Sequence, residues 1–431
     1  MKLLIITPYL PYPLDSGGNN AQFFMIEYLR EKMEITLICP HAKKEHFIEL
    51  SQKWSNVKII VLFFSENIIE KRKNNFEKMK YYLLHPSAIA ARIINKLKTN
   101  HKNVNPPQQH VFKPDSSKMQ YSKFQFIQIN KFVINKIAEH ISENTYNFIQ
   151  IEFINLLPLV FLLPNNVHKI FVHHEIGFVR NQREVETLEN PEPNDWYIVN
   201  KNKAHELSYL KHFNSIITFS TTDKFVLEKN LHSQNIFTSP FPMKKYDSLN
   251  QTNFELENLV YLGGESHYPN KDALEWFIFN VFEYISEMFP KIKLKIIGKW
   301  TEQTITAHKT NEKIHFLGYV DDLFANLKNC ALIVPLRIGS GIRAKILEAF
   351  AMGIPVISSS VGIEGITATE NLHYLKAENR DDYMKAIKIL TNSPNKAEEL
   401  TKNAMKDVVP IYEINNCGKI RYELYQKLAT T

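Results

Sequence analysis

The segment richest in chemistry places two glycines, two cations and a carboxylate within ten residues of this 431-residue chain. Gly339 and Gly341 come first, Arg343 and Lys345 follow, and Glu348 ends the series. Glycine lets the backbone approach a ligand closely. Unpaired N–H groups at a helix start carry roughly half a positive charge. Together these features predict a phosphate site.

The pattern around these residues is typical of a buried strand (331–336), a loop and a helix over Ile342–Met352, which Gly353 ends. Arg343 and Lys345 would add positive charge to a helix end that is already positive, so an anionic ligand is expected to balance them. Glu348, two turns after Gly341, is suited to bind ribose hydroxyls. Alternatively, the glycines only form a turn, and Lys345 and Glu348 form a surface pair.

Two further polar clusters follow candidate strands. His173, His174 and Glu175 come where a strand enters a loop, which is where open sheets bind ligands. A metal site at the two histidines is the alternative, but neighbours on a strand face opposite sides. The other cluster, 15–18, contains Asp, Ser and two glycines, and it could equally be an exposed turn.

Strands and helices alternate along the chain, which predicts parallel sheets. The first half has expected strands at 3–8, 34–40, 147–153, 168–175 and 215–220, with a helix at Ala21–Lys32. After a polar stretch at 246–257, strands are expected at 259–262, 293–298, 313–317, 331–336 and 355–359, with helices at 272–288 and 321–328.

This order predicts an α/β protein with two doubly wound, Rossmann-like domains facing a central cleft. We expect a first domain at 1–245 with a helical insertion at about 66–146, a second domain at 246–410, and a final helix at 411–431. A stripe of Ile420, Leu424, Tyr425 and Leu428 is expected to return that helix to the first domain.

Composition narrows the class of protein. The hydrophobic fraction of 44% supports two packed cores. Three widely spaced cysteines argue against a disulfide framework and favour the cytoplasm. The longest apolar run, 154–164, is too short to span a bilayer. The net charge of +7 favours anionic partners without selecting one.

Segments in both halves resemble the family-4, "group 1" glycosyltransferases, which have the GT-B fold. The similarity rests on Pro8 with Gly17-Gly18, Tyr261-Leu-Gly-Gly264 with Pro269-Asn-Lys-Asp272, His315-Phe-Leu-Gly-Tyr-Val-Asp321 and the strand-loop-helix segment starting at Ala331. The family motif has two glutamates separated by seven residues. Glu348 matches the second, but Ser340 stands at the first position.

The resemblance implies transfer of a sugar from a nucleotide diphosphate sugar to a glycan or lipid-linked acceptor, with retention of configuration and without a metal or other cofactor. It implies catalytic roles for His174 and Glu348. The implied donor-binding residues are Gly17, Gly18, Gly264, Lys271, Gly318, Tyr319, Gly339, Ser340, Gly341, Ile342, Arg343, Lys345 and Glu348. For Tyr319, an ordinary packed aromatic is the alternative.

Other functions stay open at this point. A sugar-nucleotide epimerase or hydrolase would share the donor pocket, and a non-catalytic binding protein would tolerate the missing glutamate. No nucleic-acid recognition motif is present, so no nucleic-acid partner is expected. The basic, partly apolar segment Lys71–Lys102 could bind an anionic membrane peripherally from the cytoplasm, or it could be a solvated helical face.

Overall fold

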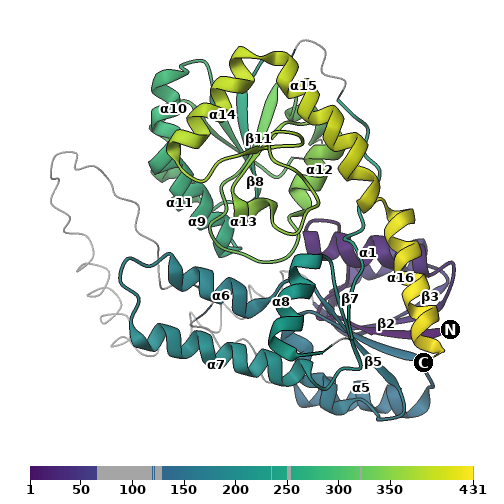
Figure 1. Cartoon of the computed structure of the whole chain (residues 1–431). Coiled ribbons are helices and arrows are strands. Elements are labelled where there is room, and N and C mark those ends of the chain that lie inside the picture. The colour runs from purple at the N-terminus through teal and green to yellow at the C-terminus, as the bar shows by residue number, and fades with distance from the viewer. Residues whose placement is uncertain are drawn as a thin grey trace, which may run out of the picture.

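Two parallel β-sheets, each covered by helices, form the two halves of the molecule (Figure 1). The computed structural model describes residues 1–65, 119, 121, 129–233, 235–249, 254–320 and 323–430. The two sheets confirm the expected doubly wound α/β class. The basic segment Lys71–Lys102, most of the expected insertion at 66–146, and Asp321 lie outside the described residues.

The N-terminal sheet has the order β3-β2-β1-β4-β5-β6-β7. Its strands are β1 (Lys2–Ile6), β2 (Glu34–Lys43), β3 (Val57–Ser65), β4 (Phe148–Glu152), β5 (His168–His173), β6 (Ser215–Thr218) and β7 (Ile236–Thr238). Its helices are α1 (Gly17–Leu29), α2 (Lys44–Lys53), α5 (Lys131–Glu143), α6 (Gly177–Glu186), α7 (Pro193–Leu210) and α8 (Thr221–Leu231), with a 3-10 segment at Ile154–Leu162.

The C-terminal sheet has the order β10-β9-β8-β11-β12-β13. Its strands are β8 (Asn258–Leu262), β9 (Lys293–Ile297), β10 (Ile314–Gly318), β11 (Cys330–Val334), β12 (Val356–Ser358) and β13 (Leu375–Lys376). The helices that follow in chain order are α9 (Tyr268–Phe277), α10 (Glu283–Met288), α11 (Glu302–His308), α12 (Ala344–Met352), α13 (Ser360–Ile363), α14 (Arg380–Asn392), α15 (Pro394–Asn403) and α16 (Ile414–Ala429). A π-helical turn at Ile278–Phe282 joins α9 to α10.

Burial explains why these runs are strands. Every residue of β4, β6, β8 and β11 is buried, as expected when helices cover both faces of a parallel sheet. The three cysteines are buried free thiols. None of the described helices is long and apolar enough to cross a membrane.

Several helices differ from the sequence-based expectation. Helix α9 begins at Tyr268 instead of Asp272, and the described part of the helix expected at 321–328 forms only a 3-10 turn at Phe324–Asn326. Two further differences, both at helix starts, affect the site. Helix α1 begins at Gly17 instead of Ala21, because Ser16 accepts a hydrogen bond from the Asn19 backbone N–H and caps the helix. Helix α12 begins at Ala344 instead of Ile342, and it ends as expected at Gly353, which has φ of +72°. The glycine pair 17–18 therefore lies in the first turn of α1, not in a loop.

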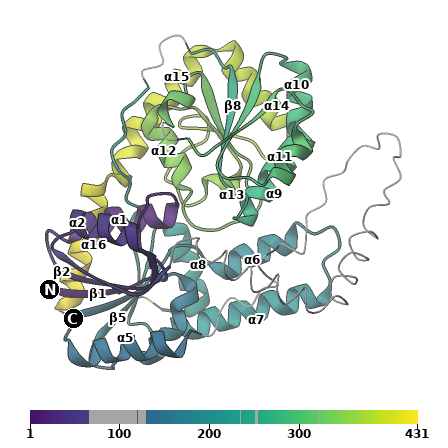
Figure 2. The ribbon, with the colours of Figure 1, turned by 180° about the vertical axis from the view of Figure 1, so that it is seen from behind.

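Helix α16 follows the C-terminal sheet in the chain but packs against α1 of the N-terminal half (Figures 1 and 2). Its buried residues are Cys417, Gly418, Arg421 and Tyr425. Of the expected apolar stripe, only Tyr425 is fully buried. Both chain ends lie beside the N-terminal sheet (Figure 2).

We predict that Gly418→Ala loosens the α16–α1 contact. A Cβ at Gly418 would lie 2.2 Å from the Tyr28 ring, so the ring or the helix must shift. Overpacking of this kind costs about 1–3 kcal/mol, more than the helix propensity that alanine gains. Urea unfolding should show a lower midpoint than in Lys419→Ala, an exposed neighbour on the same helix. An unchanged midpoint would contradict this contact.

Candidate functional site

The N-termini of helices α1 and α12 face each other between the two sheets. A Cβ on Gly17, in the first turn of α1, would lie 3.6 Å from the Cβ of Ala344, in the first turn of α12. Each helix start presents N–H groups that have no partner within the helix and carries partial positive charge. The same region therefore receives positive potential from both halves, which favours an anion.

The loop before α12 is held by contacts across the junction of the two halves. Gly341 has φ of +76°, and a Cβ there would lie 2.3 Å from the backbone oxygen of His174. Ser340 accepts a hydrogen bond from the backbone N–H of Ile176 at 2.9 Å. Ser340, which replaces the first glutamate of the family motif, thus contacts backbone of the opposite half. Ile342 is half-buried in the same loop.

A bidentate ion pair joins the halves beside this loop. Arg183 of α6 donates to both carboxylate oxygens of Glu364 at 2.7 Å, and it also donates to the backbone oxygen of Gly339 at 2.5 Å. Planar pairing of this kind is geometrically specific and stronger than a neutral hydrogen bond. It fixes the position of the glycine loop relative to α6.

The two cations of the predicted phosphate site differ in their surroundings. The Arg343 guanidinium donates to the backbone oxygens of Ser340 and Gly341, each at 2.5 Å, so it supports the loop from within. The Lys345 ammonium contacts the backbone oxygen of Leu262 and the side-chain oxygen of Asn270, the latter at 3.2 Å. Burial, together with the Arg343 charge, lowers the pKa of Lys345 to about 7.

Glu348 lies one turn after Lys345 on α12. It is contacted by α1 and by the segment that joins the two sheets. Asn20 of α1 donates to its Oε1 at 3.3 Å, and Tyr246 also hydrogen-bonds to it. Burial raises the pKa of Glu348, and the contacts with Tyr246, Lys244 and Lys345 oppose that rise. Its surroundings exclude the simple surface pair with Lys345 that the sequence left open.

His174 lies directly after β5, between rings and a carboxylate. Its imidazole stacks on Phe153 with centroids 3.9 Å apart and planes at 15°, and Phe219 meets it edge-on. Its Nε2 lies 2.6 Å from Oε2 of Glu152, the last residue of β4. Phe153 also contacts Tyr9, with ring centroids 4.9 Å apart, so the loop after β1 reaches the same place.

The neighbouring imidazoles point to different partners. His173 is fully buried, with Nε2 3.1 Å from Glu206 of α7, whereas His174 meets Glu152. Glu206 also accepts the backbone N–H groups of Gly177 and Phe178 at the start of α6. This geometry does not bring the two rings together as ligands of one metal ion.

The remaining expected donor residues lie after β8, on α9 and at the end of β10. Lys271 is buried, with its ammonium 2.7 Å from Glu265 and 3.5 Å from Glu275, so carboxylates already surround its charge. Gly264 lies close to the backbone of Lys299. Gly318 has φ of +70° and open space beside it, and Tyr319 is 67% exposed. Tyr319 is therefore not the packed core aromatic that the sequence left open.

Sequence reasoning missed several residues that contact the expected ones. They are Asn20, Glu152, Arg183, Tyr246 and Glu364. Glu152 ends a predicted strand at the edge where ligands bind, and this position could have marked it. The others are separated in sequence from their partners by about a hundred residues or more, so no local spacing reveals them.

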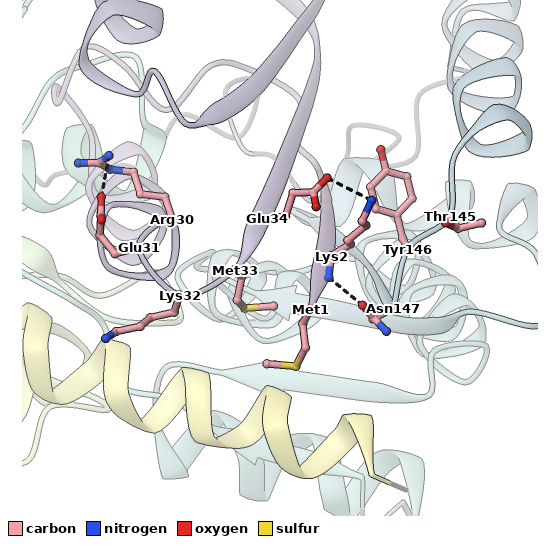
Figure 3. Close-up of a pocket in the computed structure, with 10 residues that line it drawn as sticks. All are labelled: Met1, Lys2, Arg30, Glu31, Lys32, Met33, Glu34, Thr145, Tyr146 and Asn147. Atoms are coloured by element: carbon pink, nitrogen blue, oxygen red, sulfur yellow. Dashed lines mark hydrogen bonds and ion pairs between the residues drawn. The ribbon is translucent and has the colours of Figure 1, made fainter.

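Two of the surface cavities formed by the described residues lie at opposite edges of the N-terminal sheet. The larger, about 680 Å³, is lined by Met1, Lys2, Glu34 and Asn147 among others, at the amino ends of β1, β2 and β4 (Figure 3). Parallel sheets bind ligands at the carboxyl ends, so it lies at the wrong edge for the predicted chemistry. The smaller, about 440 Å³, lies between the loop after β1 and the end of β2, beside Tyr9 and Ser16.

Comparison with known proteins gives the same class. Residues 257–393 match the family model of glycosyl transferases group 1. A mutant of S. aureus TarM in complex with fondaparinux, α-GlcNAc-glycerol and UDP has a TM-score of 0.65 at 12% identity, covering 99% of this chain and all 100% of that one. Anabaena HepE in complex with UDP-glucose has a TM-score of 0.61 at 11% identity, covering 99% of both chains.

Sucrose-phosphate synthase from Thermosynechococcus elongatus is similar over 99% of this chain and 98% of its own, with a TM-score of 0.63 at 13% identity. These likenesses extend over both sheets, and they confirm the expected GT-B fold. The molecule thus has the GT-B fold. Within this fold, the group 1 glycosyl transferase model matches residues 257–393 of the C-terminal half.

We predict that Gly341→Ala separates the two halves. The new Cβ would collide with the His174 backbone, and the left-handed φ adds strain of roughly 1–3 kcal/mol. Small-angle X-ray scattering should show a larger radius of gyration. Gly318→Ala is the matched control, because it has a similar φ but nothing within 4 Å. Equal radii in the two variants would refute the contact.

We predict that affinity for a nucleotide sugar falls as the pH rises above about 7. Lys345 is charged below its pKa of about 7 and loses its charge above it, whereas the diphosphate diester does not titrate in this range. If the bound diphosphate restores the charge, affinity should fall by roughly tenfold per pH unit between about pH 7.5 and 9. Calorimetry with UDP-glucose should show proton uptake on binding.

Lys345→Met provides the comparison for this pH dependence. It removes the titrating group while keeping the length and most of the apolar stem of the side chain. Its affinity should be lower at pH 6.5 and nearly independent of pH up to 9. A wild-type affinity that is flat over that range would show that Lys345 does not bind the diphosphate.

Proposed function

We propose that this glycosyltransferase moves a sugar from a nucleotide diphosphate sugar, with UDP-sugars as first candidates, to a glycan or lipid-linked acceptor. The observation that carries the proposal is the meeting of the α1 and α12 N-termini, with Lys345 and Glu348 in the first two turns of α12. HepE and TarM, which share the fold, were solved with UDP or UDP-glucose.

In this proposal the diphosphate lies between the two helix starts. First-turn N–H groups of α1 and α12 and the Lys345 ammonium stabilise the charge that develops on the leaving diphosphate, so the scheme requires no metal ion. Arg343 contributes its charge while it holds the loop carbonyls. Glu348 binds hydroxyls of the ribose or the sugar, and these hydrogen bonds replace its contacts with Asn20 and Tyr246.

The nucleobase and the sugar occupy opposite ends of this site. Gly318 and the exposed Tyr319 meet the base, and Gly264 and Lys271 border the path between base and diphosphate. His174 contacts the sugar. Its backbone contact with Gly341, and its ring stacking on Phe153, which in turn meets Tyr9 of the loop after β1, support that role. Retention of configuration is inferred from the family resemblance.

The acceptor enters through the smaller cavity. Its lining combines the rings of Tyr9, Tyr12 and His41 with polar Asp15 and Asn19, and such surfaces suit a molecule with apolar faces and many hydroxyls. Tyr9 contacts Phe153, which stacks on His174, so the cavity leads toward the expected reaction centre. We infer a carbohydrate portion of the acceptor at this position.

The domain assignment also remains a proposal. We place the boundary at 245/246, because the C-terminal sheet begins only at Asn258 and the N-terminal one ends at Thr238. The segment 411–431, which contains α16, crosses back to α1. A cytoplasmic location and peripheral membrane binding through Lys71–Lys102 remain predictions from the sequence.

A donor panel tests the function. UDP-, GDP- and ADP-sugars would be incubated with and without a set of oligosaccharides and lipid-linked glycans, and the released nucleotide measured. Acceptor-dependent release with one donor supports transfer. Release without an acceptor would indicate a hydrolase, and thermal stabilisation without any turnover would indicate a binding protein. Either of these outcomes contradicts the proposal.

We predict that Glu348→Ala weakens binding of the active donor. Losing a charge-assisted hydrogen bond to a hydroxyl costs about 1.5–3 kcal/mol, which corresponds to roughly 10- to 150-fold in the dissociation constant. Calorimetry should measure the affinity of this variant for the donor and for the nucleoside diphosphate. A loss for both indicates a contact with the ribose, and a loss for the donor alone indicates a contact with the sugar. Glu312→Ala, at an exposed position, is the control. Wild-type affinity in Glu348→Ala would remove Glu348 from the site.

A further inference from the structure

A buried carboxylate at the end of β4 faces the imidazole of His174. Glu152 is only 4% exposed, and its Oε2 lies 2.6 Å from His174 Nε2. Its Oε1 accepts a hydrogen bond from the side-chain amide of Gln150 at 2.6 Å. Both carboxylate oxygens are therefore occupied, as a buried carboxylate requires. Glu152 belongs to none of the sequence motifs, and only its position at a strand end could have marked it.

The balance of effects on Glu152 favours its ionised form. Burial by itself would raise the pKa of Glu152, but the hydrogen bond and charge of His174, the hydrogen bond from Gln22 and the charge of Arg421 together lower it. An ionised carboxylate can only accept hydrogen bonds. The Nε2 atom of His174 must then carry the proton that lies between them, and Nδ1 is the nitrogen left for other contacts.

Two aromatic rings restrict the His174 imidazole in addition to its contact with Glu152. Phe153 covers one face at a centroid distance of 3.9 Å, and Phe219 lies at 5.1 Å with its plane at 87°. The side chain of His174 is only 9% exposed. The aromatic rings define the ring plane, and Glu152 defines which nitrogen is protonated.

The hydrogen-bonded chain continues into the C-terminal helix. Gln150 accepts a hydrogen bond from the hydroxyl of Tyr425, which is fully buried on α16. Arg421, one turn earlier on α16 and 1% exposed, hydrogen-bonds Tyr425. Helix α16 follows the second half in the chain yet lies against the first, as Figure 1 shows. A continuous path thus leads from α16 through Gln150 and Glu152 to His174.

We propose that Glu152 is a positioning residue that fixes the ring orientation and the protonated nitrogen of His174 for sugar transfer, and that Tyr425 of α16 supports it through Gln150. This inference rests on the proposed role of His174 at the donor sugar. It assigns α16 a part in the reaction centre, because loss of its contact releases the amide that holds Glu152.

Other ionisable groups surround this pair. Tyr9 comes from the loop after β1, and Glu152, Glu175 and Asp15 together with burial raise its pKa. Glu175 follows His174 in the chain and contacts Arg180 of α6, and Arg343 of the α12 loop lies within reach of its charge. Arg421 faces Glu152 from α16. A pH profile of the reaction therefore reports on this whole set, and a comparison of variants is needed to isolate Glu152.

The first test needs no substrate. In protein carrying ¹⁵N-labelled histidine, the His174 resonances are assigned by their absence from His174→Asn. Wild type should show a single tautomer protonated at Nε2, and Glu152→Gln should show a mixture. Tyr425→Phe should give a smaller change in the same direction. An unaltered His174 spectrum in Glu152→Gln would overturn the proposal.

The second test uses the donor and acceptor found active in the panel. Glu152→Gln should lower kcat by about tenfold or more and leave the KM for the donor nearly unchanged, because partners of a functional side chain typically contribute 10- to 100-fold. In the His174→Asn background, Glu152→Gln should have no further effect. Exposed Glu139→Gln is the matched control.

The outcomes separate the two hypotheses. An equal loss of kcat in both backgrounds would mean that Glu152 acts independently of His174 and would overturn the positioning role. Full activity of His174→Asn would instead refute the proposed role of His174, while the labelled-histidine spectra would still show whether Glu152 fixes its tautomer. Thermal unfolding of each variant identifies any loss of kcat that reflects unfolding.

Discussion

Positive potential converges from both halves onto one small region, and the rest of the molecule is arranged around it. The starts of α1 and α12 face each other, and Lys345 adds an ammonium in the first turn of α12. Burial of that ammonium next to Arg343 lowers its pKa to about 7, so the protein alone stabilises the charge poorly. In the proposed mechanism a diphosphate would remove this repulsion, so that binding energy would be directed to the leaving group.

The two halves are held at this junction by contacts that involve backbone as much as side chains. Gly341 allows the donor loop to touch the His174 backbone, Ser340 receives the N–H of Ile176, and Arg183 pairs with Glu364. In this chain the position of the first motif glutamate thus serves an interdomain hydrogen bond.

A second junction, formed by α16, connects the ends of the chain to the same site. Gly418 allows α16 to approach Tyr28 of α1. The buried hydroxyl of Tyr425 donates a hydrogen bond to Gln150 of β4 in the first sheet. Packing of this helix and orientation of His174 are therefore linked through the hydrogen bonds of Glu152. The proposed reaction centre draws on β4, β5, α12 and α16, which are far apart in sequence.

The sequence by itself determined most strands of the two sheets, though not β3, β7 or β13, and it determined the helix over α12. Apolar periodicity and glycine positions are local properties of the chain, so they reveal such elements. It also placed His174 at a strand end. Only the tertiary structure decided that Glu152 meets His174, since adjacent pairing of β4 with β5 brings their ends together. Likewise, the partners of Lys271 and the exposure of Tyr319 depend on how distant elements pack, and no local pattern encodes that packing.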